Sequence, residues 1–287
     1  MTATASASPH PTPARDTVVE FTGVGKTFPG HRAVSDLNFT IARGELVSVV
    51  GVTGCGKSTM FNLTLGLFPP TDGTVRVEGH DPYADFDWFR RKVAVVFQDA
   101  RLLPWRTALQ NVCIGMKFAG VEKSEWKPRA YDWLSRLGLS GREHAFPHQL
   151  SGGQRQRVSL ARAFAVDPDV ILCDESFSAL DEITAKNLRA EFVELVRSGG
   201  KTGIVITHNI GEAMSLGNRI LVLRPPGHLA ADIHLDHVTT DQQRAELRER
   251  VLLAMDPTHE PDSDAGDPAG SISAGGARRS GAEAGRP

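Results

Sequence analysis

Apolar runs of strand length alternate with helical patterns along most of the chain. Three runs are continuously apolar, apart from Ser48, and short enough to be strands buried on both faces, namely Leu46–Val50, Val93–Phe97 and Val170–Cys173. A fourth run, Gly203–Thr207, follows a helical pattern at Glu182–Ser198. Because buried strands separated by helices are typical of a parallel sheet, the pattern predicts an α/β fold.

Further strands are expected at the margins of this sheet. Short edge strands are predicted at Thr17–Phe21 and Thr40–Ile41, and an alternating strand at Thr74–Glu78. Two more runs, Ile220–Leu223 and Leu229–Ile233, complete the sheet. We therefore expect a mostly parallel sheet with an antiparallel β edge.

Helical patterns fill the intervals between the strands. One helix is expected from about Lys57 to Gly66, and a last amphipathic helix at Asp241–Leu253. Between the second and third apolar strands, a longer helical stretch from Leu109 to Val166 is predicted to break at Pro128, Gly138 and Pro147. This stretch predicts an inserted helical subdomain at about 105–166.

The two ends of the chain differ in composition from its middle. Residues 1–16 are rich in Pro, Ser, Thr and Ala, and residues 257–287 in Gly, Ala, Asp, Ser and Pro. Such segments bury too little apolar surface to offset the entropy of ordering. We expect a disordered N-terminal arm, one folded domain at 17–256, and a disordered C-terminal tail.

Bulk composition argues against several classes of protein. The formal net charge of -2 gives no overall attraction to nucleic acid. The three cysteines, Cys55, Cys113 and Cys173, form no CxxC pair, so neither a metal knuckle nor a disulfide framework is expected. No secretory signal precedes the folded part, and no apolar run approaches the roughly 18 residues of a membrane span. If this protein acts at a membrane, we expect it to do so by docking onto another protein.

A glycine-rich segment joins the first apolar strand to the helix after it. It reads GVTGCGKST and fits the phosphate-binding loop G-x-x-x-x-G-K-[ST] in the required place between strand and helix. Backbone N–H groups and the helix dipole favour phosphate there. We expect Lys57 to reach the β- and γ-phosphates, and Ser58 to bind Mg²⁺. The expected ATP-binding residues are Gly51, Val52, Thr53, Gly54, Cys55, Gly56, Lys57, Ser58 and Thr59.

Polar residues also follow three of the other predicted strands. Asp174 and Glu175 follow Val170–Cys173, Gln98 follows Val93–Phe97, and His208 follows Gly203–Thr207. The carboxyl ends of parallel strands share one edge, so these groups should meet near the loop. Asp174 and Gln98 are candidates to hold Mg²⁺ with Ser58, and Glu175 is a candidate general base. Gln98 and His208 are also suited to sense a γ-phosphate, although a lone histidine is more often structural.

A second helix start, Leu150–Gln154, reads LSGGQ and precedes the amphipathic stretch Val158–Phe164. Ser151 is a good N-cap, and Gly152 and Gly153 expose backbone N–H groups beside Gln154. An ordinary capped helix is the alternative to an anion-binding one.

In combination these motifs resemble the ATP-binding subunit of an ABC transporter, over about residues 17–235. The resemblance implies a P-loop NTPase core and a head-to-tail dimer with a second copy of the chain. In that dimer, Ser151, Gly152, Gly153 and Gln154 would contact the neighbour's ATP. Phe28 would stack on adenine, and Asp181 would couple the two sites.

The segment Phe97–Trp105, FQDARLLPW, resembles importers of the nitrate, aliphatic sulfonate and taurine group. This implies a peripheral subunit at the cytoplasmic face of the cell membrane that couples MgATP binding, dimer closure and hydrolysis to uptake. Its partners would be transmembrane permease subunits, docked through their coupling helices, and indirectly a solute-binding protein. Leu102, Leu103 and Trp105 would supply apolar surface to the docking groove, with packing in the core as the alternative.

Two departures from the family pattern lie beside Glu175. Ser176 stands where the family usually has proline, and Ser178 where these importers commonly have glycine. Hydrolysis is still expected, but the two serines leave open its rate and the coupling between the two nucleotide sites. The alternatives are a soluble ABC ATPase acting on nucleic acid or ribosomes and an exporter subunit. The sequence shows no coiled-coil heptads and no basic bias, which argues against the soluble ATPase. It also shows no fused membrane domain, which argues against the exporter.

Overall fold

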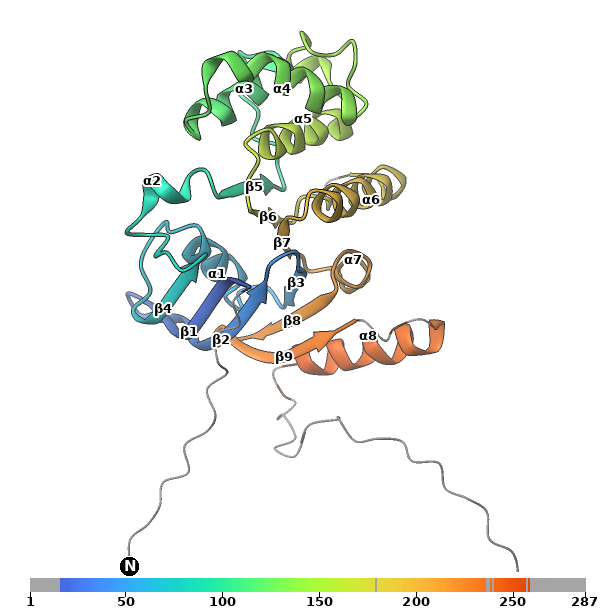
Figure 1. Cartoon of the computed structure of the whole chain (residues 1–287). Helices are drawn as coiled ribbons and strands as arrows, with labels where there is room; N and C mark the ends of the chain where they lie inside the picture. The colour runs from blue at the N-terminus through green and yellow to red at the C-terminus, as the bar shows by residue number, and fades with distance from the viewer. Residues whose placement is uncertain (1–15, 179, 236–237, 239, 257, 259–287) are drawn as a thin grey trace, which may run out of the picture.

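The computed structural model describes residues 16–256, except 179, 236–237 and 239, together with residue 258. Two β-sheets form its centre (Figure 1). The larger has six strands in the order β5-β6-β7-β3-β8-β9, and the smaller three in the order β2-β1-β4. The predicted α/β class is confirmed. The arm and tail predicted at 1–16 and 257–287 fall outside the described residues, apart from Asp16 and Thr258.

The six-stranded sheet is parallel except at one edge. Only β9 runs antiparallel, against β8. Along β6, Val170 and Leu172 belong to the core on one face, and Ile171 and Cys173 to the core on the other. The strands are β3 (Leu46–Gly51), β5 (Val93–Phe97), β6 (Val170–Asp174), β7 (Thr202–Ile206), β8 (Arg219–Arg224) and β9 (His228–His234).

The three-stranded sheet corrects one prediction. In place of short edge strands at Thr17–Phe21 and Thr40–Ile41, the structure has a hairpin of two 12-residue strands, β1 (Thr17–Phe28) and β2 (His31–Ala42). Register shifts interrupt their pairing, and such bulges break the apolar period that sequence reasoning follows. The third strand is β4 (Asp72–Val77).

Helices cover both faces of the larger sheet (Figure 1). One face packs against α1 and the small sheet, and the other against α3, α4, α5 and α6. Two short helices, α2 and α7, were not predicted. The helices are α1 (Lys57–Thr64), α2 (Phe86–Phe89), α3 (Ala108–Phe118), α4 (Lys123–Arg136), the 3₁₀ turn η1 (Pro147–Gln149), α5 (Gly152–Phe164), α6 (Glu182–Ser198), α7 (Ile210–Leu216) and α8 (Asp241–Met255).

The predicted helix break at Pro128 is wrong, because Pro128 lies inside α4. Ala130 and Leu134 are fully buried on the packed side of this helix. At its start, Trp126 Nε1 donates to the Val121 carbonyl at 2.8 Å. Tertiary packing therefore offsets the backbone hydrogen bond that proline removes.

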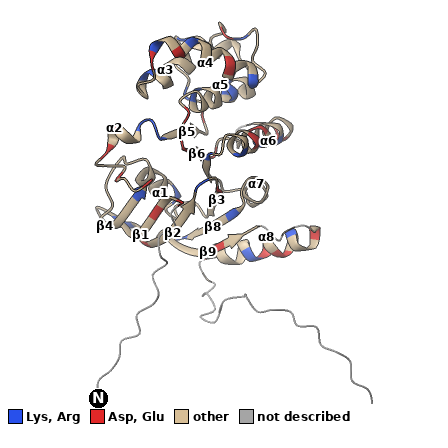
Figure 2. Cartoon of the chain, viewed as in Figure 1, with Lys and Arg blue, Asp and Glu red and all other residues tan. Residues whose placement is uncertain are grey.

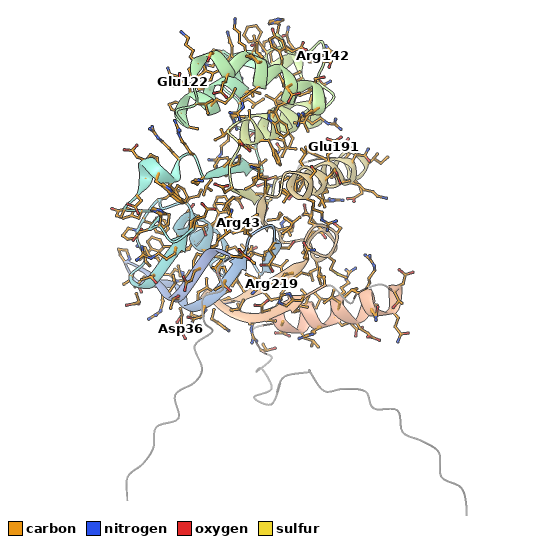
Figure 3. All side chains as sticks on the ribbon, in the orientation of Figure 1. Asp36, Arg43, Glu122, Arg142, Glu191 and Arg219 are labelled. Carbon is orange, nitrogen blue, oxygen red and sulfur yellow. The ribbon has the colours of Figure 1, made fainter. Side chains whose placement is uncertain are left out.

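A buried arginine connects the two sheets. Arg219 of β8, labelled in Figure 3, pairs with Asp232 of β9 and donates to the Thr40 carbonyl of β2 at 2.8 Å. Elsewhere both signs of charge are interspersed, as on α8 (Figure 2). Within the described residues no helix is long and apolar enough to cross a bilayer.

Candidate functional site

Four neighbouring parallel strands end at one edge of the sheet and carry the predicted site residues there. In sheet order these strands are β5, β6, β7 and β3. β5 leads to Gln98, β6 to Asp174 and Glu175, β7 to His208, and β3 to the glycine-rich loop. The carboxyl edge of a parallel sheet is where open α/β proteins bind ligands.

Close packing explains the glycines of the loop. A Cβ on Gly51 would lie 2.4 Å from both Cys55 Sγ and the Leu223 carbonyl oxygen. Gly56 has φ of 103°, and a Cβ there would lie 2.6 Å from the Ala33 carbonyl oxygen. Only glycine fits these two positions without a clash or backbone strain.

The N-terminus of α1 is open to an anion. No side chain caps it and its first turn has no acidic residue, whereas side chains cap α3, α5, α6, α7 and α8. Lys57 is buried, and its Nζ donates to the carbonyls of Gly51 at 2.6 Å and Val52 at 3.1 Å. Uncapped N–H groups beside a held ammonium are a phosphate-binding arrangement.

Asp174 is a half-buried carboxylate close to several charges. Burial raises the pKa of its carboxyl, and the neighbouring Glu175 raises it further. The positive charges of Arg101 and Lys57 oppose this rise. The charge of Lys57 therefore acts on Asp174 from the phosphate loop.

Glu175 and His208 contact each other. His208 Nδ1 lies 3.1 Å from Glu175 Oε1. Glu175 has φ of 46°, and its N–H donates to the Ile206 carbonyl of β7 at 2.9 Å. A non-glycine residue in this left-handed region is uncommon and turns its side chain away from the strand direction. A carboxylate beside an imidazole at this edge can accept a proton from a bound water.

Sequence reasoning missed the support behind His208. Thr207 Oγ1 donates to Glu212 Oε2 at 2.5 Å, and the N–H of Glu212 donates to Asn209 Oδ1 at 3.1 Å. Burial raises the pKa of the Glu212 carboxyl, which the Thr207 hydroxyl partly offsets. The spacing Asn209-x-x-Glu212 is an N-cap pattern that could have revealed α7.

Gln98 lies toward the LSGGQ segment of its own chain. It lines a cavity of about 340 Å³ together with Gly152, Arg155 and Leu180. The N-terminus of α5 closes as a capping box, in which Gln154 N donates to Ser151 Oγ at 3.2 Å and Ser151 N to Gln154 Oε1 at 3.0 Å. Ser151 and Gly152 remain exposed. In the described part of the chain, no hydrogen bond joins Ser151–Gln154 to the phosphate loop.

The remaining predicted residues lie at the surface. Phe28 ends β1 with 37% of its surface exposed, and it meets Phe68 edge-on at 5.4 Å between ring centroids. Asp181 caps α6 by accepting from Thr184 N at 3.0 Å, and this bond lowers the pKa of its carboxyl. Beside it, Ile183 is 76% exposed.

The hydroxyl groups of Ser176 and Ser178 each make a hydrogen bond in the turn that contains Glu175. Ser176 is buried, and its Oγ donates to the Val96 carbonyl of β5 at 2.7 Å. Ser178 Oγ donates to the Glu175 carbonyl at 3.0 Å in a more exposed place. The serine at 176 therefore adds a hydrogen bond between β6 and β5 that proline could not make.

Replacing Ser176 with alanine should lower the free energy of unfolding by about 1–2 kcal/mol, since a buried hydrogen bond is lost. Ser178→Ala, which removes an exposed bond, should change it by less than about 0.5 kcal/mol. Urea denaturation of both variants measures the difference. Equal stabilities would mean that the Ser176 hydroxyl contributes nothing to this turn.

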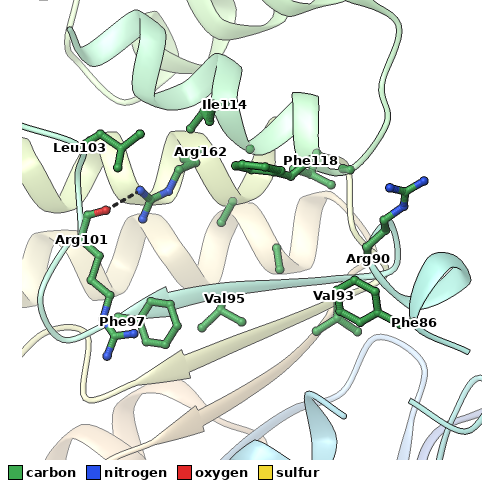
Figure 4. A pocket seen from close by; sticks show the side chains of 15 residues that line it. Phe86, Arg90, Val93, Val95, Phe97, Arg101, Leu103, Ile114, Phe118 and Arg162 are labelled. Carbon is green, nitrogen blue, oxygen red and sulfur yellow. Dashed lines mark hydrogen bonds between the residues drawn. The ribbon is translucent and has the colours of Figure 1, made fainter. Parts of the chain in front are cut away.

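A groove opens beside β5, between the sheet and the helices α3 and α5 (Figure 4). We call it the β5–α3 groove; its volume is about 570 Å³. Three arginines, Arg90, Arg101 and Arg162, line it. Its principal apolar lining residues are Phe86, Val95, Phe97, Leu103, Ile114 and Phe118.

Only one of the three residues predicted to supply apolar docking surface lines this groove. Leu103 does, whereas Leu102 packs partly buried against the core formed with α3, α4 and α5. Trp105 is 69% exposed and lies outside the groove lining. The sequence did not reveal Phe86 and Phe118, which are 59% and 69% exposed, because isolated aromatic residues resemble ordinary core positions.

Comparisons with known proteins agree with this geometry. Residues 34–178 match the family described as ABC transporter. The taurine import ATP-binding protein TauB of Rhizobium johnstonii is 38% identical over 244 residues, 79% of this chain and 90% of that protein. ProV of Escherichia coli, a glycine betaine/proline betaine transport system ATP-binding protein, is 38% identical over 74% of this chain and 52% of its own length. A dimeric post-hydrolysis structure of the ATP-binding cassette MJ0796, bound to ADP and Pi, is similar with a TM-score of 0.68 and 35% identity, over 76% of this chain and 98% of that one.

Proposed function

Because the chain belongs to the ABC transporter family and is an ATPase, we propose that it drives solute import through a separate membrane permease. The observation that carries this proposal is the convergence of four strand ends. They bring an open helix N-terminus with Lys57, the carboxylate Asp174 and the Glu175–His208 pair to one edge of the sheet. Two TauB relatives, which are 38% and 39% identical over 79% and 76% of this chain, are themselves named as import ATP-binding proteins.

The proposed cofactor is Mg²⁺, bound together with ATP. The Ser58 hydroxyl, the Gln98 amide and the Asp174 carboxylate offer the hard oxygen donors that this ion prefers. The described residues include no cluster of three or more His, Cys, Asp or Glu side chains that could hold a metal. Mg²⁺ suits such a site, because it usually takes one or two carboxylates and completes its shell with phosphates and water. When bound, it supplies positive charge that neutralises the β- and γ-phosphates.

The chain's own residues then divide the work of hydrolysis. The loop amides and Lys57 bind the phosphates and hold the γ-phosphate in place. Glu175 Oε1 accepts a proton from the attacking water, and His208, at hydrogen-bond distance, keeps this carboxylate oriented. Gln98 would help to hold the metal and to sense the γ-phosphate, and Phe28 would offer an aromatic face to adenine.

We infer that the site is completed by a second copy of the chain. The Ser151 helix start is exposed and makes no bond to its own phosphate loop within the described residues. The N-terminus of α5 could instead bind the phosphates of a nucleotide that a second subunit holds. The MJ0796 cassette has been solved as a dimer. Asp181 and the exposed Ile183 would face the partner copy.

The proposed permease contact is the β5–α3 groove. Phe86 and Phe118 line this groove and expose large apolar side chains to water. Exposed apolar surface of this kind often marks a protein contact, and the apolar face of a helix is a common occupant of such a groove. A cytoplasmic coupling helix of the permease would fill it. The subunit would then sit peripherally at the cytoplasmic face of the membrane, with a solute-binding protein as an indirect partner.

Replacing Phe118 with alanine should leave the rate of ATP hydrolysis by the isolated chain within about twofold, because exposed substitutions seldom disturb a fold. Recovery of the permease with tagged chain from detergent-solubilised membranes should fall at least about tenfold, since a large apolar anchor is lost. Tyr131→Ala, at a 41% exposed aromatic residue on α4, is the matched control. Equal permease recovery with both variants would remove the groove from the docking site.

We propose a solute of the taurine, sulfonate or nitrate class, which bears an anionic sulfonate or nitrate group. TauB supports the taurine assignment by coverage of length, 79% of this chain and 90% of its own. ProV, equally identical over a shorter stretch of its own length, serves betaines. Competition by unlabelled sulfonates, nitrate and betaine against radiolabelled taurine in whole-cell uptake separates these solutes; uptake blocked by betaine alone would exclude the anionic class.

A further inference from the structure

Another pocket lies between the helices α3 and α4, which stand side by side in Figure 1. We call it the α3–α4 pocket; its volume is about 310 Å³. Leu109, Ile114 and Trp126 give it an apolar wall. The indole N–H of Trp126 is already bonded to the Val121 carbonyl, so the ring offers apolar surface. An apolar wall with a few polar groups is the usual build of a small-molecule site, and this volume falls at the lower end of their range.

The charges around this pocket have one sign. Among the described residues that line it, four are cations and none is acidic. None of the four forms an ion pair with another described residue. They are Arg106, which precedes α3, Lys117 of α3, and Lys123 and Lys127 of α4.

The acidic residues within α4 do not neutralise these charges. Glu125 Oε2 lies 3.5 Å from Arg129 Nη1, and Asp132 Oδ2 lies 2.9 Å from Arg136 Nε. Both carboxylates therefore pair with arginines of their own helix. The α3–α4 pocket keeps its positive charge, which favours an anion.

Arg106 is the most confined of the four cations. It is partly buried, whereas the three lysines are exposed. Its Nε is buried and has no hydrogen-bond partner among the described residues. A guanidinium N–H that is buried without a partner costs free energy. Because a guanidinium presents a planar fork of donors that matches the oxygens of a carboxylate or phosphate, an oxyanion is the partner that Arg106 fits.

We propose that the α3–α4 pocket binds a small organic anion, a molecule with an apolar body and one oxyanion group. The apolar body lies against Leu109, Ile114 and Trp126, and the oxyanion pairs with Arg106 and the exposed lysines. This site shares no residue with the phosphate loop, and the inference does not depend on the proposed permease contact.

The test follows the reaction of Cys113 with N-ethylmaleimide, a neutral thiol reagent, in the full-length chain. Cys113 lines the α3–α4 pocket but not the β5–α3 groove, where arginines also stand beside aromatic residues. The other two cysteines, Cys55 and Cys173, are fully buried, so the labelling is local. Burial raises the pKa of the Cys113 thiol, and labelling at about pH 8.5 therefore increases the reactive thiolate.

The probe is anilinonaphthalene sulfonate, and phenylnaphthylamine is the matched neutral compound with the same apolar body. Both should slow the labelling of Cys113, which mass spectrometry measures. The sulfonate should reach half-protection at a concentration at least about tenfold lower, because only it makes charge-assisted hydrogen bonds. Equal protection by the two compounds, or protection by neither, would overturn the inference.

Two variants test the cations. Arg106→Gln should raise the half-protection concentration of the sulfonate at least about tenfold. The double variant Lys117→Gln/Lys127→Gln should raise it at least about threefold, and its exposed positions should leave the fold intact. Lys186→Gln, at an exposed lysine of α6, is the matched control and should leave this concentration unchanged.

Thermal unfolding of each variant is recorded in parallel. If Arg106→Gln does not fold, the double variant decides the outcome. Protection of Cys113 by the sulfonate that is as strong in the double variant as in the control would show that the cations do not form an anion site.

Vesicles of phosphatidylglycerol separate a free ligand from a membrane lipid. The pocket is too small for a lipid with two acyl chains, so these vesicles should label at the same rate as vesicles of phosphatidylcholine. Protection by the anionic vesicles without protection by the free sulfonate would overturn the small-molecule site. None of these outcomes changes the ATPase assignment, which rests on other residues.

Discussion

Replacing Glu175 with glutamine is expected to slow ATP hydrolysis more than about a hundredfold, because the amide cannot accept the proton of the attacking water. Binding of ATP should persist, since Glu175 makes no part of the phosphate loop. His208 can still hydrogen-bond the amide from 3.1 Å, so the turn should keep its shape. Release of phosphate from purified chain measures the rate, and fluorescence titration measures ATP binding.

The Glu175→Gln variant should also accumulate as a dimer when ATP is present. If two copies close over bound ATP and open after hydrolysis, a chain that binds without hydrolysing stays closed. Size-exclusion chromatography with and without ATP detects the change in mass. Glu194→Gln, which changes an exposed carboxylate farther along α6, is the matched control and should hydrolyse normally. Near-normal phosphate release by the Glu175 variant would remove Glu175 as the general base.

Replacing Lys57 with alanine is expected to weaken ATP binding more than about a hundredfold, because charge-assisted hydrogen bonds to the phosphates are lost. Its Nζ now binds the carbonyls of Gly51 and Val52, so the ammonium already stands inside the loop. Isothermal titration with ATP and Mg²⁺ measures the affinity.

This variant needs a check on folding, since Lys57 is buried and its removal leaves two carbonyl oxygens without the ammonium. The thermal unfolding temperature shows whether weaker ATP binding comes from a disrupted loop or only from the lost contact between Lys57 and the phosphates. Lys127→Ala, which removes an exposed lysine of α4, should change neither quantity. A well-folded Lys57→Ala chain with unchanged affinity would exclude Gly51–Thr59 as the phosphate site.

Local patterns determined the parts of this protein that are continuous in sequence. The buried strands β3, β5, β6 and β7 could be predicted from apolar runs, because a strand covered on both faces needs apolar residues throughout. The loop Gly51–Thr59 and the helix start at Ser151 could be predicted as well. Their glycines and caps meet conformational needs set within a few residues.

Patterns failed where packing decides the local structure. Pro128 is a helix breaker in isolation, but the buried Ala130 and Leu134 hold α4 together across it. Each strand of the hairpin β1–β2 has 12 residues, and the two strands pair with an irregular register. This pairing cannot be predicted from the sequence of either strand alone. Such elements depend on partners that are distant in sequence.

The sequence by itself determined which residues stand at the ends of the strands, and so predicted Gln98, Asp174, Glu175 and His208 as one group. Only the tertiary structure decided what surrounds them. The Ser176 bond to β5 and the Glu212 bond beneath His208 follow from contacts between separate strands and helices. The β5–α3 groove likewise exists only because α3 and α5 lie beside β5.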